Sequence, residues 1–298
     1  MSVSKQAVLI VNTRSRRGQE WFQQAKTTLK RCDIQLQDAW ACRRPEEVMR
    51  RAQEAAKRCV PLVIVGGGDG TLSSVVKYLV GSKSTLGVLP LGTGNQFARD
   101  LGINADVETA CRVFSEGRVG EVDLGTVGDD YFLNVATVGL TTRIAEELTV
   151  EAKRRFGRFV YALALARALR KVRPFKATLK MPDGEQTFET LQIVIGNGRF
   201  HAGPFPLAPD ATITDGKLEG YVLATKSRWA LLSYALHLPG GHQVDLADVA
   251  SFSTTEIALE SHPRERVTVD GEISFRTPIR LGIAPKALRV MVPQEFAG

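Results

Sequence analysis

The chain has 298 residues, of which 44% are hydrophobic, and its 39 basic and 32 acidic side chains give a formal net charge of +7. This length exceeds that of most single domains, so we expect two domains with separate cores. The sequence has no run of about 20 apolar residues that could span a bilayer, and its polar start does not resemble a signal peptide, so we expect a cytoplasmic protein.

The first 120 residues alternate between apolar runs, which are typical of strands, and segments with apolar residues at helical spacing. We expect strands over 7–12, 34–40, 62–65 and 86–89, and helices over 20–31, 45–58, 72–80 and from residue 96. Repeated strand and helix units predict a parallel sheet that is covered by helices, with ligands at the carboxyl ends of its strands.

Near residue 120 the pattern changes to short strand-like runs that are separated by turns. Asp183-Gly184 and Asp270-Gly271 are strong hairpin signals, and each predicts a type I′ turn. Two helical segments, at 142–173 and 228–238, interrupt these strands, and a last strand is expected at 288–292. The second half is therefore predicted to be largely antiparallel, with a domain boundary near residue 122.

The segment 151–173 carries eight basic side chains and one acid, which accounts for the whole net charge of the chain. Phe156, Phe159, Val160 and Leu163 follow the spacing of one helix face between the basic groups. Such a helix can lie against an anionic membrane surface, where each basic residue contributes about 1 kcal/mol. A buried helix with solvated basic ends explains the pattern equally well. Aromatic and basic residues do not interleave, so we expect no nucleic acid partner.

A glycine-rich turn follows the expected strand at 62–65 and reads Gly66-Gly67-Gly68-Asp69-Gly70-Thr71-Leu72. Glycine can leave backbone N–H groups open to a phosphate, and the start of the next helix favours negative charge. Because Asp69 would repel a phosphate unless a divalent cation lay between them, the turn suggests a magnesium nucleotide. An ordinary strand-to-helix turn, with Asp69 as the N-cap, is the alternative.

A second glycine cluster, Gly92-Thr93-Gly94-Asn95, again lies between an expected strand and an expected helix. Its threonine and asparagine side chains can bond phosphate or ribose oxygens. Both clusters would lie at the same edge of one sheet, which favours a shared ligand. Neither cluster is a Walker P-loop or a dinucleotide fingerprint.

These clusters resemble two signatures of the diacylglycerol kinase catalytic-domain family, which includes bacterial soluble lipid kinases and the sphingosine kinases. The resemblance extends nearly end to end, because three further motifs are similar to those of the family: 122–125 with 132–136, then 196–198 with 207–209 and 215–218, and last Val269-Asp270-Gly271-Glu272. Together with the two glycine clusters these are five motifs in the order of the family. They identify the family with high specificity, but they say much less about which substrate the protein uses.

The resemblance implies a fold and an activity. The expected fold is an α/β nucleotide domain with a parallel sheet, like that of phosphofructokinase and NAD kinase, over 1–122 and a returning C-terminal segment 284–298. A β-rich, mainly antiparallel lipid-substrate domain is expected over 123–283. The implied activity is transfer of the γ-phosphoryl of ATP to a lipid hydroxyl, with Mg²⁺ as cofactor and transient contact with the membrane.

The resemblance also implies roles for individual residues. Asp270 and Glu272 would be the catalytic carboxylates, and Asp69 and Asp123 would reach magnesium through water. A second, structural magnesium is implied at the side chain of Asp215 and at the backbone carbonyls of Thr212 and Lys217. The implied nucleotide-binding residues are Asn12, Gly66, Gly67, Gly68, Asp69, Gly70, Thr71, Leu72, Gly92, Thr93, Gly94 and Asn95.

The chain also departs from the family pattern. Gln96 stands where the family has an acid of the magnesium network, Ala39 falls about where many members have a nucleotide-contacting threonine, and Thr13 replaces a proline. These changes predict a weaker or differently tuned nucleotide site. Asp183-Gly184-Glu185 is the same tripeptide as Asp270-Gly271-Glu272, so the residues alone do not show which of the two aspartates is the catalytic base.

Two other functions stay open at this point. An NAD kinase also carries Gly-Gly-Asp-Gly-Thr, although the second cluster and the late Asp-Gly-Glu argue against it. A catalytically idle regulator that binds nucleotide or lipid is suggested by Gln96 and Ala39.

Overall fold

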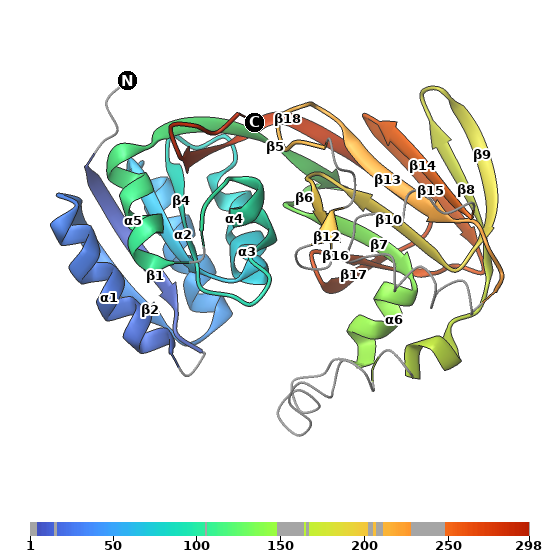
Figure 1. The fold of residues 1–298 in the computed structure, drawn as a ribbon, viewed down its shortest axis with the longest axis horizontal. Coiled ribbons are helices and arrows are strands. Elements are labelled where there is room, and N and C mark those ends of the chain that lie inside the picture. Colours follow the sequence, from blue (N-terminus) through green and yellow to red (C-terminus); the bar gives the residue numbers. More distant parts are fainter. Residues whose placement is uncertain are drawn as a thin grey trace.

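The computed structural model describes residues 5–14, 17–104, 106–147, 164, 167–201, 205–206, 211–227 and 248–297 (Figure 1). The expected helix at 228–238, the motif at 207–209 and most of the basic segment 151–173 lie outside the described residues. Among the helices that are described, none is long and apolar enough to cross a membrane.

The first half of the protein is built on parallel strands. In the described chain they are β1 (Gln6–Asn12), β2 (Gln35–Cys42), β3 (Leu62–Gly67) and β4 (Thr85–Pro90), in the spatial order β2-β1-β3-β4. The strands β3 and β4 are buried along their whole length. Continuous apolar runs such as Leu62-Val63-Ile64-Val65 suit this position, because helices cover both faces of the sheet.

Amphipathic helices connect these strands. They are α1 (Gly18–Arg31), α2 (Pro45–Lys57), α3 (Asp69–Leu79), α4 (Gln96–Asp100) and α5 (Val107–Glu116). The chain runs from β1 to β2 through α1, and then returns across the sheet through α2 and α3. Because such connections between parallel strands are right-handed, α1 lies on one face of the sheet and α2 and α3 lie on the other. Accordingly, α1 packs against α5, and α2 packs against α3.

Sequence signals explain where these helices begin. Pro45 stands in the first turn of α2, followed by the acids Glu46 and Glu47 at the positive end of the helix dipole. Asp106 caps α5, because its carboxylate accepts the backbone N–H of Thr109 at 2.7 Å.

The second half is antiparallel. Its separate sheet has the order β14-β13-β10-β7-β16-β17, and a short hairpin pairs β11 with β12. The bounds are β7 (Val135–Gly139), β10 (Gln192–Gly196), β11 (Phe200–His201), β12 (Phe205–Pro206), β13 (Leu218–Leu223), β14 (Val249–Thr254), β16 (Arg266–Val269) and β17 (Glu272–Arg276), with α6 (Leu140–Glu147) after β7. The predicted fold class, a parallel α/β part and a mainly antiparallel β-rich part, is confirmed.

One long strand joins the two halves. β18 (Ile279–Val292) pairs in parallel with β4 and antiparallel with β5 (Arg118–Val127), which itself pairs with β6 (Asp130–Phe132). Beyond β18 the sheet continues through β15 (Glu256–His262), β8 (Phe175–Met181) and β9 (Gly184–Thr190). Figure 1 shows β5 and β18 running together from the helix-covered half into the β-rich half. The strand expected at 288–292 is thus only the end of a longer one.

The two predicted hairpins form, but their turns differ. Asp270 and Gly271 both have left-handed φ angles, of 47° and 87°, as a type I′ turn requires. At the other hairpin Gly184 has a φ of 141° and Asp183 is not in the left-handed region, so the type I′ prediction is wrong there.

Asp123 fixes the place where the chain passes between the halves. Its buried carboxylate accepts the N–H of Gly216 on Oδ2 and the N–H of Lys286 on Oδ1, both at 2.7 Å. Lys286 lies in the irregular stretch of β18 between Ala284 and Leu288 and has a φ of 52°. The carboxylate therefore ties β5 to that irregularity and to the loop before β13.

We expect Asp123→Ala to lower the free energy of unfolding by about 3 kcal/mol, because the backbone N–H groups of Gly216 and Lys286 lose the buried carboxylate that accepts them. Urea denaturation in the absence of magnesium measures the loss. Asp129→Ala is the matched control, since Asp129 is exposed in the turn after β5 and should leave stability nearly unchanged. Equal stability of the two variants would contradict this role of Asp123.

Candidate active site

The two glycine clusters meet at one edge of the parallel sheet, as the sequence predicts. β3 and β4 pair in register as far as Gly67 and Pro90, and the N–H of Leu91 donates to the carbonyl of Gly67 at 2.9 Å. A Cβ atom on Gly92 would lie 2.4 Å from the Cα of Gly68. Only glycine fits at this contact, so the closeness of the two clusters is set by the sequence.

The end of β1 contributes a third part of this edge. Asn12 Nδ2 donates to Thr71 Oγ1 at 3.0 Å, and Asn12 Oδ1 accepts the N–H of Arg14 at 3.1 Å. A cavity of about 280 Å³ opens beside them. Its lining contains several of the predicted nucleotide-binding residues together with residues of α2: Asn12, Pro45, Val48, Gly68, Gly70, Thr71 and Ser74. We call it the first cavity.

In the second cluster, Asn95 holds the loop in shape. Its backbone is left-handed, with a φ of 49°, and its side chain is buried. Oδ1 accepts the N–H of Gly92 at 2.8 Å, and Nδ2 donates to the carbonyl of Gly92 at 2.9 Å. Because both ends of this amide are bonded within the loop, Asn95 supports the exposed Thr93 and does not itself project outward.

Asp69 belongs to the first cluster and is the first residue of α3, and its side chain lies against Gly94 of the second cluster. Its Oδ1 accepts the N–H of Phe97 at 3.1 Å. Burial raises the pKa of this carboxyl above its usual value; the N–H groups of Phe97 and Gln96 oppose the rise, and the negative charge of Asp270 adds to it. The structure therefore brings Asp69 and Asp270 close enough for their charges to interact.

Asp270 lies at the tip of the β16–β17 hairpin and points back toward the first half. Its Oδ1 accepts the N–H groups of Asn134 and Val135, at 2.9 and 3.1 Å. Its Oδ2 accepts the N–H of Leu133 at 2.8 Å and the hydroxyl of Ser73 at 2.7 Å. The carboxylate is thus held by the segment before β7 and reaches α3.

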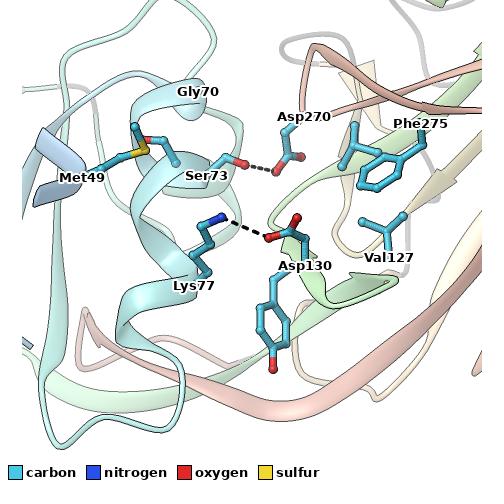
Figure 2. A pocket seen from close by; sticks show the side chains of 11 residues that line it. Met49, Gly70, Ser73, Lys77, Val127, Asp130, Asp270 and Phe275 are labelled. Atoms are coloured by element: carbon cyan, nitrogen blue, oxygen red, sulfur yellow. Dashed lines mark hydrogen bonds and ion pairs between the residues drawn. The ribbon is translucent and has the colours of Figure 1, made fainter. Parts of the chain in front are cut away.

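A second cavity, of about 210 Å³, lies beside Asp270 (Figure 2). It has an apolar side formed by Val127, Val269 and Phe275, and across it Lys77 pairs with Asp130 at 3.3 Å. Gly70 and Ser74 line both this cavity and the first one. The two cavities therefore adjoin at the start of α3.

The residues predicted for the structural magnesium lie apart from this cluster, in the loop before β13. Asp215 is exposed, and its carboxylate accepts the N–H groups of Thr212 and Lys217, at 3.1 and 2.9 Å. Asp123 bonds to the same loop through Gly216. In the described part of the chain, no group of three or more His, Cys, Asp or Glu side chains is arranged to hold a metal ion.

For Glu272 the structure describes the backbone, which begins β17, and its side chain lies outside the described residues. The two Asp-Gly-Glu tripeptides differ clearly in their surroundings. Asp183 is exposed in the β8–β9 turn, whereas the carboxylate of Asp270 is bonded to two other segments of the chain.

Sequence reasoning missed Ser73, Lys77 and Asp130. Ser73 stands 197 positions from its partner Asp270, and Lys77 stands 53 positions from Asp130. The position of Ser73, directly after the first glycine cluster, was the one available signal, because it places the side chain within a helical turn of Asp69.

Comparison with known families assigns both parts of the chain. Residues 6–127 match the model of the diacylglycerol kinase catalytic domain. Residues 134–292 match that of the YegS C-terminal NAD kinase beta sandwich-like domain. A kinase catalytic domain is thus followed by a β-sandwich domain.

Similar proteins agree with these matches. A probable lipid kinase, YegS-like, from Chromohalobacter salexigens is 33% identical over 258 residues, 84% of this chain and 81% of the relative. One of the same description from Klebsiella pneumoniae is 32% identical over 88% of this chain and 87% of the relative. The chain belongs to the diacylglycerol kinase catalytic-domain family, among its YegS-like lipid kinases.

Solved structures share the fold. Two from Bacillus anthracis, one of them described as a diacylglycerol kinase, superpose with TM-scores of 0.83 and 0.79. Both are 23% identical in sequence, and the superpositions cover 98% and 97% of this chain and 96% and 97% of those chains.

The raised pKa of Asp69 has a testable consequence for stability. Because the folded protein binds the Asp69 proton more tightly than the unfolded chain does, ionisation of Asp69 destabilises the fold. Without metal, Asp69→Asn should therefore be more stable than the wild type at neutral pH. The advantage should shrink as the pH falls toward about 4, the ordinary value for aspartate. Thermal unfolding in a chelator measures it.

Asp106→Asn serves as the opposite control. The N–H and the hydroxyl of Thr109 lower the pKa of Asp106, so its ionised form stabilises the fold and this variant should lose stability at neutral pH. A loss of stability in Asp69→Asn as well would contradict the burial argument.

Proposed function

We propose that this protein transfers the γ-phosphoryl of ATP to the hydroxyl of a lipid, with Mg²⁺ as cofactor. One observation carries the proposal: the carboxylate of Asp270 lines a cavity that adjoins the first cavity, which is lined by Asn12, by residues of the first glycine cluster and by α2. In a phosphoryl transfer the nucleotide and the attacking hydroxyl must lie side by side, with a carboxylate at the hydroxyl.

The donor groups fit a magnesium nucleotide. Glycine backbones leave no side chain between the two clusters, as the contact of Gly68 and Gly92 indicates, and the start of α3 favours an anion. Asp69 and Asp270 form a pair of neighbouring negative charges that a cation would relieve. Oxygen donors are those that Mg²⁺ prefers, and the bound ion would neutralise charge that develops on the phosphates.

We assign the residues as follows. Asn12, Thr71 and Thr93 would bind the phosphates and ribose, and Asp69 would hold magnesium through water, with Gln96 supplying an amide where the family has an acid. Asp270 would accept the proton of the lipid hydroxyl, and Glu272 would assist it. For Asp123, Asp215 and the carbonyls of Thr212 and Lys217, magnesium ligation stays part of the proposal.

The surroundings of Asp270 favour a lipid over a nucleotide acceptor. Val127, Val269 and Phe275 give the second cavity an apolar side next to the base. An amphipathic acceptor could place its hydroxyl at Asp270 and its apolar part against these side chains. An NAD acceptor would meet few polar partners on that side.

We further propose that the protein is cytoplasmic and touches the membrane transiently through the basic segment 151–173. In its described part, Ala168 and Val172 are buried beneath the second sheet, while Arg167, Arg170 and Lys171 are exposed. Exposed basic side chains beside a buried face are suited to an anionic lipid surface.

The test is transfer of labelled phosphate from ATP to a panel of lipids in mixed micelles, with NAD as a separate acceptor. Diacylglycerol, phosphatidylglycerol, a ceramide-like base and monoacylglycerol make up the panel. Asp270→Asn should reduce transfer about 1,000-fold, the range of general-base contributions. Thermal unfolding checks that the variant is folded.

Asp183→Asn is the control, since it changes the same tripeptide in the exposed hairpin and should retain full activity. If the protein phosphorylates NAD and none of the lipids, it is an NAD kinase and the proposed lipid acceptor is wrong. Magnesium-dependent binding of ATP without transfer to any acceptor would indicate the idle regulator.

A further inference from the structure

Ser73 fills the last acceptor position on the predicted base. An ionised carboxylate offers about four lone-pair positions. Among the described residues, the N–H groups of Leu133, Asn134 and Val135 occupy three of them on Asp270, and the hydroxyl of Ser73 occupies the fourth at 2.7 Å (Figure 2). An attacking hydroxyl must therefore displace one of these donors before it can pass its proton to Asp270.

An attacking hydroxyl cannot readily displace the three backbone donors. They lie at the junction of β6 and β7, where Val135 also accepts the N–H of Asp270 at 2.9 Å. Moving them would break the strands that position the base. The Ser73 hydroxyl, in contrast, leaves Asp270 by rotation about a single bond.

The neighbouring serine shows where a rotated hydroxyl can go. Ser74 donates its hydroxyl to the carbonyl of Thr71, three residues earlier in α3, at 2.8 Å. Serine in a helix commonly bonds a carbonyl three or four positions before it. Ser73 has such carbonyls one turn back, so it can release Asp270 without leaving its own hydroxyl unbonded.

We propose that Ser73 shields Asp270 from water until the acceptor hydroxyl displaces it. This inference rests on the proposed kinase function and concerns the same base. Without the shield, a water molecule at Asp270 would give its proton to the carboxylate while its oxygen bonds to the γ-phosphorus. The bond from that phosphorus to the β,γ-bridging oxygen would break, and ADP would leave with that oxygen. ATP would then be hydrolysed without phosphorylating a lipid.

The test is ATP hydrolysis by the purified protein with Mg²⁺ and no lipid. We expect Ser73→Ala to hydrolyse ATP about tenfold faster than the wild type, the factor that corresponds to one lost hydrogen bond of ordinary strength. Ser73→Thr keeps the hydroxyl and should stay at the wild-type rate. Combining Ser73→Ala with Asp270→Asn should abolish the gain, because the same base serves water and lipid.

Acceptor lipid provides a second measurement. Micelles of a lipid that the protein phosphorylates should suppress the excess hydrolysis of Ser73→Ala, since the free hydroxyl of this acceptor takes the vacated position. Ser115→Ala removes a helix hydroxyl on α5 that bonds the carbonyl of Arg112, and it should behave as the wild type.

The outcomes separate the two proposals. If Ser73→Ala is folded and phosphorylates lipid but hydrolyses ATP no faster than the wild type, the shielding role is wrong and the kinase assignment stands. If neither the wild type nor Ser73→Ala consumes ATP with any acceptor, both proposals are wrong.

Discussion

The pairing of β18 with strands from both halves is the constraint on which the site depends. In one continuous sheet, β18 pairs with β15 near its start, with β4 near its end and with β5 over most of its length. Because this sheet fixes the halves relative to each other, a hairpin tip of the second half can reach a helix of the first. The bond between Asp270 and Ser73 exists only through that geometry. Asp123 completes the constraint by fixing the irregular stretch of β18.

Electrostatics divide the acidic residues of this region into two kinds. Asp123 and Asp270 are surrounded by backbone N–H groups, which satisfy a carboxylate without any cation. Asp69 is different, since its burial outweighs the hydrogen bonds that it accepts. Under the proposed function, Asp69 is therefore the acid that would gain most from a bound cation.

The sequence predicted the elements well where the signal was local. Apolar runs identified β3 and β4, and Pro45 with its two acids marked the start of α2. The extent of β18 was missed, since an irregular stretch interrupts its alternation of buried and exposed residues. Asp270 and Asp183 share one tripeptide, and only tertiary contacts separate them; Ser73 was invisible for the same reason, because no local pattern records a contact across 197 positions.

The position of β18 in the sheet also bears on how the protein folds. β18 is the last strand of the described chain, yet it is an interior member of the sheet, with β5 along one side and β15 and β4 at successive positions along the other. Its parallel pairing with β4 closes a loop of about 200 residues, from Leu86 to Val290. Contacts of such high sequence separation slow folding, because the entropy of closing the loop is lost before the contact forms. The glycine clusters can be ordered early, whereas the complete site has to await the insertion of this strand.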